Sequence, residues 1–232
     1  MSNKTALFNM RPIRTTLLGA CLMATAGFAQ AGVITLSGDH FSVSYDEALV
    51  DPLYKTALLS GSQDTVYFLP TTFAAVTGDA PTSTSAALQF TLTIDPGYSF
   101  AGIQFAENGD YFLSNGGFVG ATASLHATNP DTFASTLLDL TSPALGVVGG
   151  FTPWALSGLL GAGGLGAPQT LTVDFENTLH SEPSGGLGFI QETYVGFRVL
   201  TQAAPQSVPE PSGLALLLGG GLAAWAVRRR RL

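Results

Sequence analysis

Cysteine and basic residues are scarce in this chain of 232 residues. The single cysteine, Cys21, excludes a disulfide within the chain and a cluster of thiolate metal ligands. Between residues 32 and 207 the basic residues are Lys55 and Arg198 alone, whereas fifteen of the sixteen acidic residues lie there, so this part has a formal charge of −13. Such a surface repels phosphate backbones and anionic lipids, which excludes nucleic acid as a partner.

Common catalytic and cofactor motifs are also missing. The sequence has no G-x-S-x-G motif, and none of His40, His126 and His180 lies within four residues of another. Residues 161–166 match the spacing G-x-G-x-x-G, but Pro168 and a predicted strand follow where a phosphate-binding motif requires a helix. We therefore expect no catalytic residues, no cofactor and no metal site, and we predict that the protein is not an enzyme.

Carboxylates and aromatic residues keep an alternative open, a secreted enzyme that acts on polysaccharide. A glycosidase needs two carboxyl groups close together in space. Asp174 and Glu176 share one face of a predicted strand, where they are expected to point to solvent. Residues 107–110 offer oxygen ligands for Ca²⁺, but they lack the regular spacing of an EF-hand loop. Trp154 and the tyrosines are candidates for stacking on sugar rings, although a core position is favoured for Trp154.

The N-terminal region has the organisation of a secretory signal peptide. Basic residues precede an apolar stretch at 17–28, and Ala29 and Ala31 form an A-x-A site, so signal peptidase is predicted to release a chain that starts at Gly32. The alternative is a lipoprotein signal that ends at Cys21. It is disfavoured because only about six apolar residues precede the cysteine and the hydrophobic run continues after it.

The last 25 residues contain three parts in a fixed order. In the first part, two prolines hold a glutamate on an extended, exposed backbone, because proline fixes φ and removes a hydrogen-bond donor. A short apolar run and a cluster of arginines follow, and the arginines are expected to stay in the cytoplasm because they cannot cross a bilayer at low cost. The three parts are Val208-Pro209-Glu210-Pro211, the apolar run 214–227, and Arg228-Arg229-Arg230-Arg231.

This tail resembles the PEP-CTERM sorting signal of Gram-negative bacteria that make extracellular polysaccharide. In that family the Pro-Glu-Pro tripeptide, the apolar helix and the arginines are read together by exosortase, a membrane protease-transpeptidase. The resemblance implies export across the inner membrane, a transient hold in that membrane through residues 212–227, and processing by exosortase. It also implies a final location at the cell surface or outside the cell.

An ordinary single-span anchor is the alternative interpretation of the tail. A transmembrane helix over residues 212–227 would be about 24 Å long, which is short of the roughly 30 Å hydrocarbon core of a bilayer. Residues 219–221 are three consecutive glycines, which weaken a helix in its interior. A short helix of this kind favours a temporary hold over a permanent anchor.

The region between the two ends shows the period-two pattern of antiparallel strands. Apolar residues alternate with threonine and other polar residues at 88–94, 171–176 and 195–199, as expected for strands with one buried face and one face in water. Eight to ten short strands at this spacing predict an all-β protein, an antiparallel β-sandwich of jelly-roll or Ig-like kind.

The remaining elements are predicted from weaker patterns. Turn residues lie at 95–97, 108–110 and 115–117, where the second turn is expected to form a tight hairpin. Residues 131–140 are the best helical candidate, and 154–159 is an ambiguous strand. Further strands are predicted at 33–36, 41–45, 65–69, 98–106, 111–113 and 118–126.

Together these patterns predict an exported surface or matrix protein with a structural or adhesive role in a biofilm. Its expected partners are signal peptidase and exosortase for processing, with exopolysaccharide as a candidate ligand. The predicted segments are a signal peptide at 1–31, a β-sandwich domain at 32–202, a linker at 203–207 and the sorting signal at 208–232.

Overall fold

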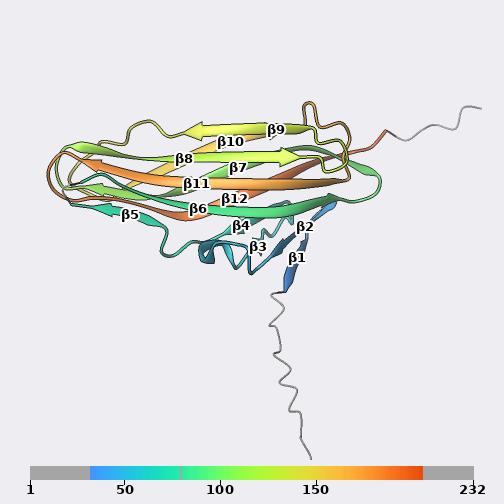
Figure 1. Ribbon diagram of the computed structural model, residues 1–232, viewed down its shortest axis with the longest axis horizontal. Helices are drawn as coiled ribbons and strands as arrows, with labels where there is room; N and C mark the ends of the chain where they lie inside the picture. Colours follow the sequence, from blue (N-terminus) through green and yellow to red (C-terminus); the bar gives the residue numbers. More distant parts are fainter. Residues whose placement is uncertain (1–31, 79, 206–232) are drawn as a thin grey trace, which may run out of the picture. The chain divides into compact units, whose positions relative to one another are not determined.

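The computed structural model describes residues 32–78 and 80–205, which form two antiparallel sheets (Figure 1). Sheet A has the strand order β1-β2-β6-β11-β8-β9, and sheet B has the order β10-β7-β12-β4-β3, with β5 also paired to β12. The elements are β1 (Val33–Ser37), β2 (Phe41–Asp46), the 3₁₀ helix η1 (Pro52–Tyr54), β3 (Leu58–Leu59), β4 (Thr65–Phe68), β5 (Ala74–Thr77), β6 (Thr82–Ile94), β7 (Tyr98–Leu113), β8 (Gly117–Thr128), β9 (Ser135–Thr141), β10 (Thr152–Gly161), β11 (Thr170–Pro183) and β12 (Gly188–Ala203).

The long strands form because their apolar residues recur at every second position. Along β11, Leu171, Val173 and Phe175 are buried while the residues between them are at least partly exposed. The same alternation holds in β6, so both strands have one face for the core and one for water. The all-β sandwich predicted from the sequence is confirmed, although the long strands reach 13 to 16 residues and are not short.

Phenylalanine side chains from both sheets fill the centre of the core. Phe175 of sheet A lies 5.3 Å from Phe105 and 5.1 Å from Phe197, ring centre to ring centre, and both of these come from sheet B. Phe90 of sheet A and Phe68 of sheet B also pack against Phe197. Edge-to-face pairs of this kind add to the hydrophobic stabilisation of a sandwich core.

The turn at residues 95–97 is confirmed, but the hairpin predicted at 108–110 is wrong. Strand β7 continues through this segment, with Asn108 opposite Tyr194 and Asp110 opposite Gln191 on β12. Gly109 is needed here for close approach, because a Cβ at this position would meet the carbonyl oxygen of Gln191. Pairing with strands on both sides therefore overrides the local turn preference of the sequence.

The helix predicted at 131–140 is also wrong. Residues 129–134 form a loop in which Phe133 has a φ of 59°, and β9 then pairs with β8 at the edge of sheet A. A helix of this length gains little without a partner for an amphipathic face, whereas the neighbouring strand supplies hydrogen bonds at once. The ambiguous segment at 154–159 lies within strand β10, and the short strands β3 and β5 were not expected.

Candidate functional site

The predicted sorting and cleavage residues mostly lie outside the described part of the chain. This holds for Ala29 and Ala31 and for the C-terminal signal, which comprises Val208, Pro209, Glu210, Pro211, Arg228, Arg229, Arg230 and Arg231. Gly32, the predicted first residue of the mature chain, is exposed, and its carbonyl accepts a hydrogen bond from the Glu47 backbone N–H at 3.4 Å. Within residues 32–78 and 80–205 no helix is long and apolar enough to span a membrane.

A pair of tyrosines lies on the face of sheet B that points away from the core. Tyr67 of β4 and Tyr194 of β12 stack with ring centres 5.8 Å apart and planes at 25°. Gly196 is the cross-strand neighbour of Tyr67, and a Cβ on Gly196 would meet the hydroxyl end of Tyr194. The absence of a side chain at Gly196 thus leaves room for the Tyr194 ring beside Tyr67.

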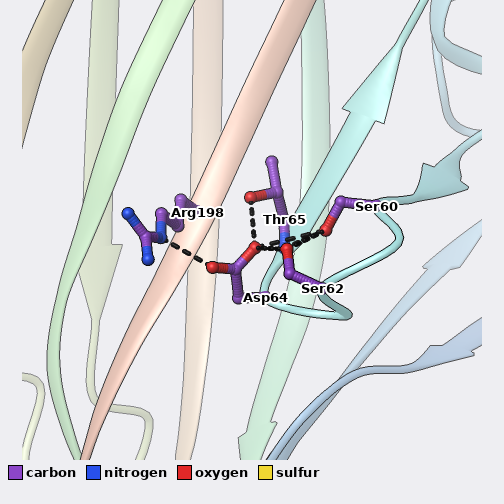
Figure 2. Close-up of polar contacts among 5 residues, drawn as sticks. All are labelled: Ser60, Ser62, Asp64, Thr65 and Arg198. Carbon is purple, nitrogen blue, oxygen red and sulfur yellow. Dashed lines mark hydrogen bonds and ion pairs between the residues drawn. The ribbon is translucent and has the colours of Figure 1, made fainter.

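Asp64 is held next to this pair by four side chains (Figure 2). Its Oδ1 accepts hydrogen bonds from Ser62 Oγ at 2.6 Å, Thr65 Oγ1 at 2.8 Å and Ser60 Oγ at 3.2 Å. Its Oδ2 accepts one from Arg198 Nε at 2.8 Å. The hydrogen bond from Ser62 comes first among the causes that lower the pKa of Asp64 to about 2, and the Arg198 charge is the smallest of them.

Arg198 and Asp64 give the tyrosine pair a polar border. The Arg198 side chain is 53% exposed, so its guanidinium reaches water as well as Asp64. Partial burial, followed by the nearby Tyr67 and Asp64, raises the pKa of Tyr194, which therefore keeps its proton at neutral pH. We call these four residues, Asp64, Tyr67, Tyr194 and Arg198, the outer platform. It combines aromatic faces with donors and acceptors, which is the chemistry that a polyhydroxyl ligand requires.

Three phenylalanines extend the aromatic surface on the same sheet. Phe151, just before β10, is 71% exposed and lies 5.5 Å from Phe112 of β7 and 6.0 Å from Phe189 of β12. Phe189 and Phe112 are cross-strand neighbours, and Val76 of β5 continues this row on the other side of Phe189. Sheet B therefore presents two aromatic groups to solvent, five residues apart along β12.

A second polar group lies inside the sandwich. Glu107 of β7 and Glu192 of β12 are each 1% exposed, and Asn177 of β11 faces them from sheet A with the same 1% exposure. Asn177 Nδ2 donates to Glu107 Oε2 at 2.6 Å and to Glu192 Oε2 at 3.1 Å. Tyr54 of η1 donates its hydroxyl to Glu192 Oε2 at 3.5 Å. We call Tyr54, Glu107, Asn177 and Glu192 the inner cluster.

Burial dominates the electrostatics of the inner cluster. It raises the pKa of Glu107 and the pKa of Glu192, and the charge of Glu107 is a second cause that raises the pKa of Glu192. The ion pairs formed by described residues join His40 to Asp39 and Arg198 to Asp64, so neither supplies a cation to these carboxyls. The two glutamates of the inner cluster are thus held in the core without a counter-charge from the described residues.

The calcium candidate at 107–110 is wrong because its two acidic residues point to opposite faces of β7. Glu107 points into the core and Asp110 points outward, as expected for positions that differ by an odd number along a strand. Asp174 and Glu176 point outward as predicted, and Asp174 accepts a hydrogen bond from Gln89. A buried acid pair exists, but it unites Glu107 with a residue 85 positions later, Glu192.

The three histidines stay apart in the described structure. His40 stacks on Tyr98 with ring centres 3.6 Å apart, whereas His126 and His180 lie on the neighbouring strands β8 and β11. Among the described residues, no group of three or more His, Cys, Asp or Glu side chains has the geometry of a metal site. Trp154 is 4% exposed and donates its indole N–H to the Gln191 carbonyl at 3.0 Å, which confirms its core position.

The outer platform and the inner cluster both depend on an irregularity of β12 that can be traced in the sequence. Ile190 and Glu192 are buried at even positions, whereas Val195, Phe197 and Val199 are buried at odd positions. This change of phase coincides with a register shift between Glu192 and Tyr194. A bulge adds one residue and so turns Glu192 inward and Tyr194 outward. The switch of the buried apolar residues from even to odd positions within β12 is the feature of the sequence that could have predicted this arrangement.

Comparison with known proteins identifies the C-terminal tail. The family model of the PEP-CTERM protein-sorting motif matches residues 207–231. No curated protein matches the chain.

Solved structures give only distant likenesses. The carbohydrate-binding module TmCBM61 in complex with β-1,4-galactotriose has 11% identity and a TM-score of 0.25, covering 68% of this chain and 88% of that one. A carbohydrate-binding module of the β-sandwich superfamily has 9% identity and a TM-score of 0.22, covering 73% of this chain and 97% of that one. The enzymatically active domain of tailspike protein 4 of bacteriophage CBA120 has 15% identity and a TM-score of 0.23, covering 74% of this chain and 20% of that one. Likenesses at these TM-scores carry no argument about function.

Proposed function

We propose that this is an exported protein sorted by exosortase and that its β-sandwich body, residues 32–207, binds exopolysaccharide through the outer face of sheet B. The match of residues 207–231 to the PEP-CTERM protein-sorting motif supports the first part of the proposal. The role is structural or adhesive, at the cell surface or in the matrix of a biofilm. The observation that carries the proposal for the β-sandwich body is the partly exposed, stacked tyrosine pair on the outer face of sheet B.

The outer platform suits a sugar chain for three physical reasons. The flat faces of Tyr67 and Tyr194 offer apolar area to the C–H faces of sugar rings. Arg198 and Asp64 add a donor and an acceptor at the border, where they can bond hydroxyl groups. The body's formal charge of −13 disfavours a polyanionic ligand, so a neutral polysaccharide is the preferred class.

We further propose that the body is not catalytic. The acid pair of the inner cluster is closed off from a polymer in solvent, because both carboxyls are 1% exposed. Asp174 and Glu176 lie on one outward strand face, which is a different arrangement from two carboxyls that flank a scissile bond.

In the proposed processing pathway, the N-terminal and C-terminal segments of the chain are removed in separate steps. Signal peptidase cleaves after Ala31, the segment 212–227 holds the chain in the inner membrane for a time, and exosortase acts at Pro209–Pro211. The arginines at 228–231 set the depth of the segment, since their charges remain on the cytoplasmic side.

Intact-mass measurement of protein recovered from the medium and the envelope of the native host tests the processing. The expected mature chain begins at Gly32 and ends near Pro209–Pro211. A chain that retains Trp225 and the arginines would establish a permanent anchor instead. Glu210→Ala, or alanine at all four arginines, should leave export intact and block removal of the tail, and unchanged tail removal in both variants would contradict the proposal.

Binding to exopolysaccharide from the native host tests the body. Affinity electrophoresis in gels that contain this polysaccharide should show strong retardation of the wild-type chain. Tyr67→Ala and Tyr194→Ala should each reduce the retardation several-fold, since stacking on one ring is lost. Tyr98→Ala is the matched control, because Tyr98 stacks on His40 at a different place in the fold. Equal retardation of all four proteins would refute the site, and release of reducing ends would refute the non-catalytic role.

A further inference from the structure

We propose that Glu107 and Glu192 form a buried proton-binding site, in which the two carboxyls retain a proton at neutral pH and thereby couple the stability of the sandwich to pH. The outer platform and its ligand play no part in this inference. It rests on the burial of the pair, on the absence of a cation beside it and on the contacts of Asn177.

The first observation is that two acidic side chains share a site closed to water. Both glutamates are 1% exposed and both accept hydrogen bonds from the same amide nitrogen, which brings their Oε2 atoms together. Two ionised carboxylates at such a distance repel each other strongly in a medium of low dielectric constant. Transfer of an unpaired carboxylate into a core is so costly that the group binds a proton instead.

The second observation is that no cation in the described chain compensates the pair. The basic residues of the body are Lys55, which is exposed, and Arg198, which pairs with Asp64 on the outer face. Asn177 contributes an N–H but no net charge. The pair must therefore obtain its positive charge from solution, and a proton is the smallest cation that can enter a packed core.

The third observation is that the pair has unused acceptor atoms. Glu107 Oε1, Glu192 Oε1 and Asn177 Oδ1 are buried and have no hydrogen-bond partner within the described chain. Unpartnered buried oxygens are costly, so each of them favours a donor in the same space. A carboxylic acid O–H is such a donor, and one retained on the pair satisfies one of these oxygens.

The neighbouring elements offer no other group that could take over the titration. Tyr54 of η1 is the titratable side chain in contact with the pair, and burial raises its pKa far above the neutral range, so it stays protonated. Asp51, at the start of η1, adds a negative charge near Tyr54 and so opposes ionisation. From β11 the pair meets Asn177, and on β10 the residue opposite Glu107 is Leu156, and neither of these side chains titrates.

The sign of the pH effect follows from the direction of the shift. Burial raises the pKa of Glu107 from 4.5 to about 8, and that of Glu192 is also raised. The folded chain therefore binds more protons than the unfolded chain at any pH above about 4.5 and below the folded values. The stability that the protonated pair contributes is fully present below pH 4.5 and is lost as the pH rises. For each proton retained, the unfolding equilibrium constant changes about tenfold per pH unit.

Urea unfolding of the full chain in a mild detergent between pH 5 and pH 8 tests the proposal. The compared proteins are the wild type, Glu107→Gln, Glu192→Gln, and Asp174→Asn as a matched control at a partly exposed, outward-facing carboxylate. The ratio of the wild-type unfolding constant to that of either glutamine variant should rise at least tenfold over this range. The ratio of the wild type to Asp174→Asn should stay constant. A glutamine variant whose ratio to the wild type does not change with pH would overturn the proposal.

Two further measurements keep the proposal testable if the glutamine variants fail to fold. A carbon-13 NMR titration of the wild-type glutamate carboxyls should show at least one that is still protonated at pH 7, and ordinary titration of all of them near pH 4.5 would overturn it. Addition of calcium chloride at pH 8 should not change the wild-type unfolding midpoint. Stabilisation of the wild type by calcium that Asp174→Asn retains would point to a metal ion on the buried pair and overturn the proposal.

Discussion

The inner cluster and the outer platform place the same functional group, a carboxyl, in opposite surroundings. Asp64 has three hydroxyl donors, an arginine and access to water, and its pKa falls to about 2. Glu107 and Glu192 have an amide and a tyrosine as neighbours, are 1% exposed and have no cation beside them among the described residues, and their pKa values rise. The difference shows that donor number and solvent, rather than residue type, decide the charge of a carboxyl in this protein.

Removal of the amide from the inner cluster is expected to have the largest effect on stability. Asn177→Leu fills a similar volume but leaves both carboxyls without their shared donor, which should cost about 3 kcal/mol of unfolding free energy. Urea unfolding at pH 7 measures the loss. Gln89→Leu is the matched control, since Gln89 is an exposed amide on the adjacent strand β6 and should change stability by less than about 0.5 kcal/mol. Similar losses in both variants would show that the inner cluster is not specially sensitive.

Removal of the charge from the outer platform should have a smaller effect, with the opposite pH dependence. Because the folded pKa of Asp64 lies below the unfolded value of 3.8, its contribution is fully present above pH 3.8 and disappears as the pH falls through about 2. Asp64→Asn should lose about 1 kcal/mol at pH 7, a modest figure because water screens the site. Thermal unfolding should show the full difference between the wild type and the variant at pH 7 and a much smaller difference at pH 2.

The relative weight of the donors around Asp64 can be resolved by two single substitutions. Ser62→Ala removes the shortest hydrogen bond, of 2.6 Å, whereas Arg198→Gln removes a half-exposed charge. We expect the pKa of Asp64 to rise more in Ser62→Ala, with stability losses below about 1 kcal/mol in both variants. A carbon-13 titration of the Asp64 carboxyl measures the shift. A larger rise in Arg198→Gln would mean that the ion pair, and not the hydroxyl group, controls this carboxyl.

The smallest expected effect on stability comes from Gly196→Ala. The added methyl group meets the hydroxyl end of Tyr194, which can swing toward solvent, so unfolding free energy should change by less than about 0.5 kcal/mol. Polysaccharide retardation should nevertheless fall, because the Tyr194 ring leaves its place beside Tyr67. Ala106→Ser, at the cross-strand neighbour of Gly196 on β7, is the control and should retain binding. Unchanged retardation of Gly196→Ala would mean that polysaccharide binding does not depend on the position of the Tyr194 ring.

Sequence reasoning succeeded where the pattern was local and repeated. The alternation at 88–94, 171–176 and 195–199 lies in the observed strands β6, β11 and β12, because one buried face imposes a period of two. It failed at 108–110 and 131–140, where turn and helix preferences compete with pairing to a strand far away in the chain. Local preference is worth only tenths of a kcal/mol per residue, which a full set of cross-strand contacts exceeds.

The candidate site was recovered only in part. The sequence indicates the tyrosines as candidates for sugar contact, but no local pattern predicts that Tyr67 lies beside Tyr194, which is 127 positions later. Proximity in the sequence suggests Asp110 as the partner of Glu107, whereas in the folded chain the two side chains lie on opposite faces of β7 and Glu107 lies beside Glu192. The bulge in β12 decides which residues of that strand face the core, and one extra residue reverses the assignment on either side of it.

By itself, the sequence determined that the chain carries a PEP-CTERM sorting motif and an antiparallel β body, since both are written in contiguous residues. The fate of individual charges was decided by tertiary structure. Three of the four donors to Asp64 lie within four residues of it in the sequence, and only Arg198 reaches it from β12. Glu192, in contrast, is removed from solvent only because β12 packs into the sandwich between β7 and β4. Local donors therefore lower one pKa, whereas burial produced by long-range pairing raises the other.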